Sequence, residues 1–248
     1  MRMYSGFADY YDRLTDNVPY VKWVGYFERL FKKFRKEPHL ILDLACGTGS
    51  ISKILAQRGY EVIGVDFSEE MLSYALEKTD GMENQPMFIV QPIDMLDMYG
   101  TVDTVVSCLD SLNYITTPAT LKRVFSRVFN FLEPDGLFIF DLNTEARFIA
   151  HSDETFIRED EDFYCVWKAS YSPKSHICRY YVDIFEGPDE EEKYSLMREI
   201  HRERYYPESE IRALLDETGF KVYGIFGELK TSAPRENEQR VFYVAGRK

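Results

Sequence analysis

The sequence predicts an α/β fold with a doubly wound, mostly parallel sheet of seven strands, and the order of its segments supports this. Short apolar runs alternate with segments of helical periodicity from residue 40 to residue 142. The runs are almost continuously apolar, as expected for strands that helices cover on both faces. A segment at residues 155–206 breaks this order and predicts an inserted antiparallel sheet.

Apolar residues recur at spacings of three and four in residues 4–36, which predicts a helical segment that Pro38 ends. Seven apolar runs then predict strands at residues 40–44, 61–66, 88–90, 104–108, 137–142, 222–226 and 241–245. The helices between them are expected to start near residues 51, 68, 117 and 208. Ser68 and Thr117 are suited to cap two of these helices. Residues 134–136 predict a turn before the fifth strand.

The insertion contains three stretches in which side chains alternate between two faces, at residues 163–171, 176–185 and 194–205. Turn-forming residues separate them at 173–175 and 187–189. We therefore expect a core of residues 1–150 and 207–248, within which residues 1–36 form an N-terminal helical cap. Residues 151–206 form the antiparallel insertion.

A glycine-bearing turn follows the first strand, in the run Asp43-Leu44-Ala45-Cys46-Gly47-Thr48-Gly49. In a parallel α/β sheet, this strand-to-helix turn is a ligand site by topology. Gly47 and Gly49 let the backbone approach a ligand closely, and the next helix offers free N–H groups. Asp66 ends the second strand 17 residues after Gly49, close to the ~20 expected for a carboxylate that binds ribose hydroxyls.

Two features of this turn favour S-adenosylmethionine (SAM) over a dinucleotide as the ligand. The dinucleotide fingerprint reads Gly-x-Gly-x-x-Gly or Ala, whereas this run reads Gly-x-Gly-x-x-Ser and ends at Ser52. Asp43 also places negative charge where a diphosphate would bind, and this charge suits an ammonium and a sulfonium. An NAD-type oxidoreductase stays as the alternative.

The same run resembles motif I of class I SAM-dependent methyltransferases, which have a Rossmann-like fold. Asp43, Gly47 and Gly49 match the motif, and Ala45 replaces a glycine. Further motifs resemble the family in order over residues 38–145, including Asp66-Phe67 and Asp94-Met95. The resemblance implies that the protein binds SAM and releases S-adenosylhomocysteine (SAH). The residues it implies as cofactor contacts are Tyr11, Asp43, Ala45, Gly47, Thr48, Gly49, Asp66, Phe67, Met71, Asp94, Met95 and Cys108.

Each of the later motifs implies a specific contact with the cofactor. Asp66 corresponds to the acid that holds the ribose, and Phe67 to the apolar residue that flanks adenine. Asp94 and Met95 resemble the pair that contacts the adenine amine. Cys108 begins the motif that lies beside the methyl donor.

The segment from Phe7 to Asp12 resembles the opening of the small-molecule branch of this family, which includes sugar-amine and glycine N-methyltransferase-like enzymes. The resemblance implies that an N-terminal helix folds over SAM and that Tyr11 lines the pocket; packing within a helix is the alternative role for Tyr11. Residues 151–206 are similar in position to an acceptor lid or dimer surface of this branch. The chain is therefore expected to be a monomer or a homodimer.

Methyl transfer is an in-line displacement, so the enzyme mainly aligns the reactants and excludes water. An amine acceptor needs only a neutral lone pair, whereas a hydroxyl acceptor needs a base. The candidate catalytic residues are Asp110 and Tyr114 after the fourth strand and His201 in the insertion. Glu199 and Glu203 share a face with His201 and favour its charged form. The alternatives are a loop cap for Asp110 and a surface position for His201.

Composition narrows the choice of partner and compartment. The net charge of −12 argues against a nucleic-acid partner. The four cysteines form no C-x-x-C pair, which predicts free thiols in a reducing compartment. Without a signal-like or membrane-spanning apolar run, the protein is expected to be cytoplasmic. No metal is predicted, because carboxylates and histidines do not cluster by spacing. The aromatic content of 15% fits either a pocket or an aromatic core.

The sequence therefore predicts a methyltransferase that moves a methyl group from SAM to nitrogen or oxygen of a small-molecule acceptor. An RNA methyltransferase is the first alternative, which the net charge disfavours. The second is a non-catalytic SAM-binding module that acts through protein partners.

Overall fold

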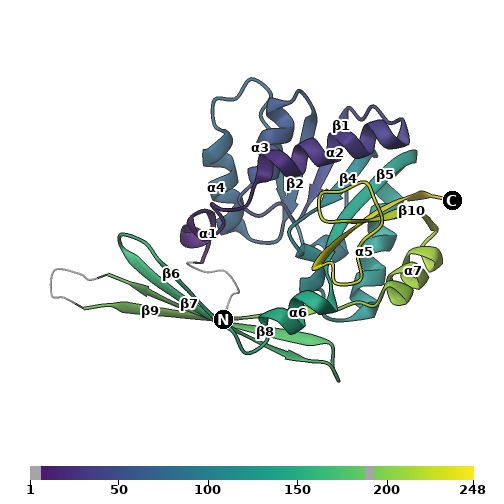
Figure 1. The fold of residues 1–248 in the computed structure, drawn as a ribbon. Helices are drawn as coiled ribbons and strands as arrows, with labels where there is room; N and C mark the ends of the chain where they lie inside the picture. Colours follow the sequence, from purple (N-terminus) through teal and green to yellow (C-terminus); the bar gives the residue numbers. More distant parts are fainter. Residues whose placement is uncertain (1–6, 188–192) are drawn as a thin grey trace.

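The computed structural model describes residues 7–187 and 193–248, so the first residues of the predicted cap and most of the predicted turn at 187–189 lie outside the described residues. The described chain contains two sheets and the helices that pack on them (Figure 1). The larger has seven strands in the order β10-β11-β5-β4-β1-β2-β3, and the smaller has four in the order β6-β7-β8-β9. The predicted α/β class with an inserted antiparallel sheet is confirmed.

The larger sheet reverses its strand order between β1 and β4, where the chain returns from β3 to the other side of β1. In this sheet, as far as the chain is described, only β11 runs antiparallel to its neighbours. The carboxyl ends of β1 and β4 meet at the reversal, which is where open α/β sheets bind ligands. Its strands are β1 (Leu40–Leu44), β2 (Glu61–Asp66), β3 (Met87–Val90), β4 (Val102–Ser107), β5 (Leu132–Asn143), β10 (Phe220–Gly227) and β11 (Arg240–Arg247).

Helices cover both faces of the larger sheet because its strands are apolar on both sides. In β5, Ile139 packs with α2 (Tyr20–Phe34) and α3 (Ser50–Gln57), whereas Phe138 and Phe140 face α5 (Pro118–Phe131) and α7 (Glu208–Glu217). The helix α4 (Glu69–Thr79) packs beside α3 and β3. The largest fully buried side chains are Phe and Tyr, so part of the aromatic content fills the core.

The predicted N-terminal helix is two helices, α1 (Ala8–Leu14) and α2. The N–H and Oγ1 of Thr15 both donate to the Tyr11 carbonyl and close α1. Pro19 then prevents α1 and α2 from forming one continuous helix, because it disfavours helical backbone in the residue before it and has no N–H to donate. The end of α2 also differs from the prediction: Arg35, at φ 55°, stops the helix before Pro38.

The smaller sheet is an antiparallel meander whose inner face packs against α1, where Tyr10 contacts Phe163 and Cys165. Figure 1 shows α1 between this sheet and α4. Three of its strands match the predicted stretches, whereas the short edge strand and the helix α6 (Glu145–His151) before it were not predicted. The strands are β6 (Thr155–Glu159), β7 (Phe163–Ser172), β8 (Ile177–Glu186) and β9 (Ser195–Arg204).

Local signals in the sequence had mixed outcomes. Ser68 and Thr117 cap α4 and α5 as predicted, each accepting a backbone N–H with its side chain. The predicted turn at residues 134–136 is instead a bulge within β5, across which the pairing with β4 shifts. In the described ranges, no helix combines the length and apolarity needed to cross a membrane.

Candidate functional site

A cavity of about 340 Å³ lies where the larger sheet reverses its strand order, and its lining includes Asp66, Asp110 and Arg240. This volume falls within the ~300–1,000 Å³ that is usual for small-molecule sites. A narrow pocket of about 40 Å³ adjoins it and reaches Asp43 and Thr48. The two spaces share the residues Tyr11, Ala45, Gly47, Leu109 and Ser111. The predicted ligand turn therefore forms one wall of a continuous site.

The motif turn meets the cavity at Ala45 and Gly47, whose φ values are 62° and 54°. A Cβ added to Gly47 would meet no protein atom within 4 Å, so this position borders open space that a ligand can use. Gly49 has a different role from the one predicted. It is the N-cap of α3 and does not line the cavity, and a Cβ there would lie 2.8 Å from the Ala75 Cβ. Gly49 is needed for packing.

Asp66 connects the end of β2 to the motif turn. Its Oδ2 accepts the N–H of Gly47 at 2.9 Å, and its Oδ1 accepts the N–H of Ser68 at 3.0 Å. Burial raises the pKa of this carboxyl. Each carboxylate oxygen has a second lone pair, so Asp66 can accept sugar hydroxyls while it holds the turn. Phe67 and Met71 line the cavity beside it, as predicted.

Asp43 lies at the base of the narrow pocket, together with Thr48 and Cys108. Its Oδ2 accepts the hydroxyl of Ser52 at 2.6 Å. Burial raises the pKa of Asp43 to about 7; the Ser52 hydrogen bond opposes this shift, and the nearby charge of Asp66 adds to it. A cation in the pocket would favour the ionised carboxylate.

The helix α1 and the segment after it roof the cavity with Tyr11, Thr15 and Val18. Polar contacts fasten this roof to the motif turn. Asp12 accepts the Thr48 hydroxyl at 2.6 Å and pairs with Lys78 at 2.7 Å. The pocket role of Tyr11 is therefore consistent with its position, and its neighbour Asp12 holds α1 over the turn.

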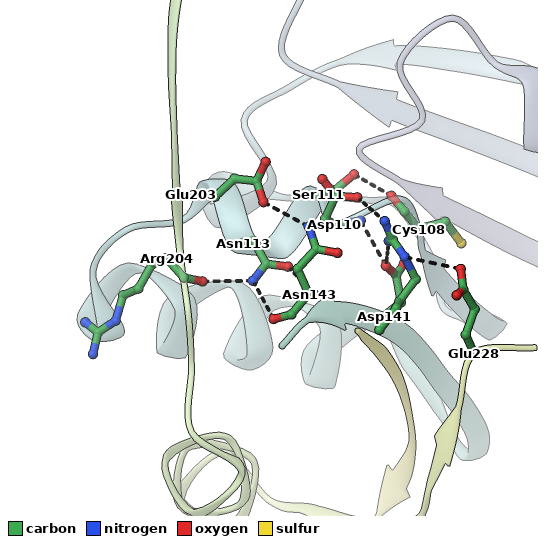
Figure 2. A network of polar contacts seen from close by, with 10 residues as sticks. Cys108, Asp110, Ser111, Asn113, Asp141, Asn143, Glu203, Arg204 and Glu228 are labelled. Carbon is green, nitrogen blue, oxygen red and sulfur yellow. Dashed lines mark hydrogen bonds and ion pairs between the residues drawn. The ribbon is translucent and has the colours of Figure 1, made fainter. Parts of the chain in front are cut away.

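The loop after β4 forms the opposite wall, where Leu109 and Asp110 have φ values of 58° and 57°. Oδ1 of Asp110 accepts from the Arg240 guanidinium at 2.7 Å. Asp141 pairs with the same guanidinium and accepts the Asp110 N–H at 3.0 Å (Figure 2). Arg240 is almost completely buried. Asp110 is therefore an ion-paired residue of the cavity wall.

A second set of hydrogen bonds joins this loop to the smaller sheet (Figure 2). Asn113, in the short helix η2 (Ser111–Tyr114), donates to the Arg204 carbonyl at 2.8 Å and accepts the Asn143 N–H at 2.9 Å. The side-chain amide of Asn143 donates to Glu203 Oε2 at 3.0 Å. Burial raises the pKa of Glu203 well above its usual range. These bonds connect β5, η2 and β9 at the edge of the cavity.

The other two predicted catalytic residues lie in different places. Tyr114 lines the cavity, whereas His201 does not. His201 is 3% exposed, its Nε2 lies 3.0 Å from Glu199 Oε2, and its ring packs against Tyr114 and Phe7. The surface alternative for His201 is therefore wrong, whereas its catalytic role stays a prediction, for a side chain that is buried and does not line the cavity.

The predicted adenine contacts at Asp94 and Met95 are also displaced. Both belong to the short helix η1 (Ile93–Met95), of which only Ile93 lines the cavity. Asp94 pairs with Arg123 at 2.9 Å, and Met95 is 64% exposed. A 3₁₀ turn directs successive side chains about 120° apart, so one of three neighbours faces the ligand space.

A second groove lies apart from the cavity and the motif turn. This wider groove of about 650 Å³ lies between α6, α7 and residues 234–239, but no residue of the motif turn lines it. Within residues 7–187 and 193–248, no three His, Cys, Asp or Glu side chains gather as a metal site would require. All four cysteines are free thiols.

Comparisons with known proteins agree with this geometry. A model of methyltransferase domains matches residues 41–136. The putative methyltransferase YqeM of Bacillus subtilis is 35% identical over 98% of this chain and 96% of its own length. The chain belongs to the class I SAM-dependent methyltransferases. A crystal structure of a SAM-dependent methyltransferase from Clostridium acetobutylicum matches this methyltransferase with a TM-score of 0.86 and 28% identity, over 99% of both chains. A glycine/sarcosine N-methyltransferase of Halorhodospira halochloris is 25% identical over 92% of the chain and 82% of its own length.

Sequence reasoning missed two charged residues in the cavity wall of the methyltransferase, Arg147 and Arg240. Arg240 enters the site because β11 pairs with β5, which places it opposite Asn143. No local signal marks such a position, since it depends on a pairing between segments about 100 residues apart. Arg147 lies on α6, a helix that was not predicted. The other lining residues that were missed are Thr15, Val18, Ile93, Leu109, Ser111 and Ile115.

Proposed function

We propose that this methyltransferase transfers the methyl group of SAM to a small-molecule acceptor that enters beside Asp110, Tyr114 and Arg147. The observation that carries the proposal is the arrangement of the cavity walls around the motif turn. The cavity has walls from the motif turn and from the loop after β4, and α1 roofs it. The net charge of −12 also opposes a nucleic-acid acceptor. In this proposal residues 1–150 and 207–248 hold the cofactor, and residues 151–206 form an acceptor lid.

The cavity residues fit SAM, because the space beside Gly47 is open to a ligand and the carboxylates of Asp66 and Asp43, which line the two spaces, can accept from hydroxyl and ammonium groups. In the proposed arrangement Asp66 holds the ribose, Phe67 and Met71 flank the adenine, and Asp43 attracts the ammonium. Bound SAM supplies an electrophilic methyl group on a sulfonium. Tyr11 and α1 then exclude water, and the loop after β4 orients the acceptor.

Nitrogen is the favoured acceptor atom. A hydroxyl acceptor needs a base, whereas an amine needs only its lone pair. The carboxylates that line the cavity in the described chain are Asp66, which holds backbone N–H groups, and Asp110, which is paired with Arg240. The similarity to a glycine/sarcosine N-methyltransferase also supports nitrogen.

The proposal can be tested with the purified protein and SAM labelled in its methyl group. The panel contains small amines, phenols and other hydroxyl compounds, with transfer RNA as a separate arm. We expect the label to enter an amine and SAH to accumulate. Label in transfer RNA alone would replace the proposal with an RNA methyltransferase, and SAH binding without any turnover would indicate a non-catalytic module.

Replacement of Asp66 by alanine is expected to weaken SAH binding by about 1–3 kcal/mol, which is roughly 5- to 150-fold in Kd. The variant loses both the proposed hydroxyl contacts and the bond that holds the Gly47 N–H. Isothermal titration calorimetry measures the change, with the far-ultraviolet spectrum as a check on folding. A folded variant that binds SAH as tightly as the wild type would refute the ribose role.

SAH affinity is expected to increase about tenfold between pH 6 and pH 8 if Asp43 attracts the ammonium. With a pKa of about 7 in the cofactor-free protein, Asp43 is mostly protonated at pH 6 and mostly ionised at pH 8. Only the ionised form attracts a cation, so affinity increases with pH. Calorimetry across this range should show a flat profile in Asp43→Asn. An identical pH profile in the variant and the wild type would exclude Asp43 as the source.

A further inference from the structure

Arg147 is a charged residue of the cavity wall for which the proposed cofactor contacts provide no role. It extends from α6 and lines the same space as Asp110 and Tyr114. Its Nε is buried without a hydrogen-bond partner. Across the residues that the structure describes, its guanidinium makes no hydrogen bond or ion pair with protein. An Arg fork with five N–H donors facing a cavity is suited to a planar or tetrahedral anion.

The carboxyl groups around Arg147 are already engaged with other groups. Asp110 is paired with Arg240. Glu145, on the same helix, accepts the Tyr171 hydroxyl at 2.8 Å. Glu203 is close enough to interact with the Arg147 charge, but it accepts from Asn143, and burial raises its pKa in favour of the neutral form. None of these carboxylates pairs with Arg147, so within the described residues its guanidinium has no direct ion-pair partner.

SAM carries a sulfonium, an ammonium and a carboxylate, so it adds a net positive charge to the site. The buried Nε–H of Arg147 has no acceptor, and an anion beside it would supply a charge-assisted hydrogen bond. We propose that Arg147 forms an anion subsite in the acceptor pocket, so that the acceptor carries a carboxylate or phosphate near the atom that is methylated. This inference rests on the proposed function, because it assigns the space beside Arg147 to the acceptor.

The test uses inorganic phosphate and acetate as probes on the full chain saturated with SAH. Each anion is compared with chloride at equal ionic strength by thermal unfolding. We expect phosphate or acetate at about ten times its Kd to raise the Tm by roughly 3 °C or more. Arg147→Gln, which removes the charge but keeps a polar side chain, should lose this shift, and Arg147→Lys should retain part of it. Arg127→Gln is the matched control, because Arg127 is an exposed arginine on α5.

The two probes distinguish the two kinds of acceptor. A Tm shift with acetate alone indicates an acceptor that carries a carboxylate, and a Tm shift with phosphate alone indicates one that carries a phosphate. No anion-specific shift in the wild type, or the same shift in Arg147→Gln, would overturn the subsite. A loss of SAH affinity in Arg147→Gln equal to the loss of the anion effect would also overturn it, because Arg147 would then belong to the cofactor site.

Turnover gives a second, independent measurement. Glycine is compared with glycinamide, and phosphoethanolamine with ethanolamine, as methyl acceptors. The wild type should favour the anionic member of one pair at least tenfold in kcat/KM, and Arg147→Gln should lose that preference mainly through KM. A preference for the neutral members refutes the subsite. Failure of every small acceptor refutes the proposed function instead, and the anion-dependent Tm shift then still decides whether the subsite exists.

Discussion

Gly47→Val is expected to abolish measurable SAH binding while the protein stays folded. Gly47 adopts φ 54°, and the direction of its missing Cβ meets no protein atom within 4 Å. A branched side chain there would occupy the space beside the motif turn and would force the backbone out of the left-handed region. Calorimetry with SAH measures the loss, and thermal unfolding reports the accompanying decrease in stability of roughly 1–2 kcal/mol.

Gly81→Val is the matched control for this prediction. Gly81 also has a positive φ, 72°, and open space around its missing Cβ, but it lies in the turn after α4 and does not line the cavity. Both variants carry the same kind of backbone strain, so only Gly47→Val should lose SAH. If Gly47→Val binds SAH within a few-fold of the wild type, the motif turn is not the cofactor site.

Arg240→Ala is expected to destabilise the protein by about 3–5 kcal/mol. The guanidinium is the shared partner of Asp110 and Asp141, and all three side chains are largely shielded from solvent. Its removal leaves two desolvated carboxylates without their cation. For a chain of this length we expect the Tm to fall by roughly 6–20 °C. The loop after β4 should lose its orientation as well, so methyl transfer should decrease in the folded fraction.

The pH dependence of this defect provides an internal check. Burial raises the pKa of Asp141 to about 6 even in the presence of Arg240. A raised carboxyl pKa means that folding favours the protonated form, so the desolvation cost is absent at low pH and increases as pH rises through the folded pKa. The difference between Arg240→Ala and the wild type should therefore shrink as pH falls toward 4. Arg212→Ala removes an exposed pair with Glu208 and should change stability by less than about 1 kcal/mol. A similarly small change for Arg240→Ala would contradict the prediction.

The sequence was most informative where local chemistry decides local structure. The strands of the larger sheet are apolar on both faces, and Ser68 and Thr117 cap their helices with their own side chains. The motif turn was found because Gly47 and Asp66 occupy fixed positions at the ends of two adjacent strands, and a bond between them now joins those ends. In each case the signal spans only a few residues or one strand–helix unit.

The parts that were wrong or missed depend on contacts between distant segments. Asp94 has the predicted position in the chain, but it pairs with Arg123 on α5 and does not line the cavity. His201 lies on the predicted face of β9, yet η2 and α1 cover that face. Arg240 reaches Asp110 through the pairing of β11 with β5. Periodicity predicts which way a side chain points within its element, but not what packs against it.

The contacts of α1 differ on its two sides, although both include ion pairs, since Arg13 pairs with Asp160 and Asp162 between β6 and β7. Tyr10 on one side of α1 packs into the apolar cluster of the smaller sheet. On the other side, Asp12 meets Thr48 and Lys78 through polar contacts, in which ionic strength screens the charged pair. Salt does not screen apolar packing, so the contact between α1 and the motif turn is the more sensitive of the two to ionic strength. High salt is therefore expected to loosen α1 from the motif turn, while the apolar cluster still holds α1 on the smaller sheet.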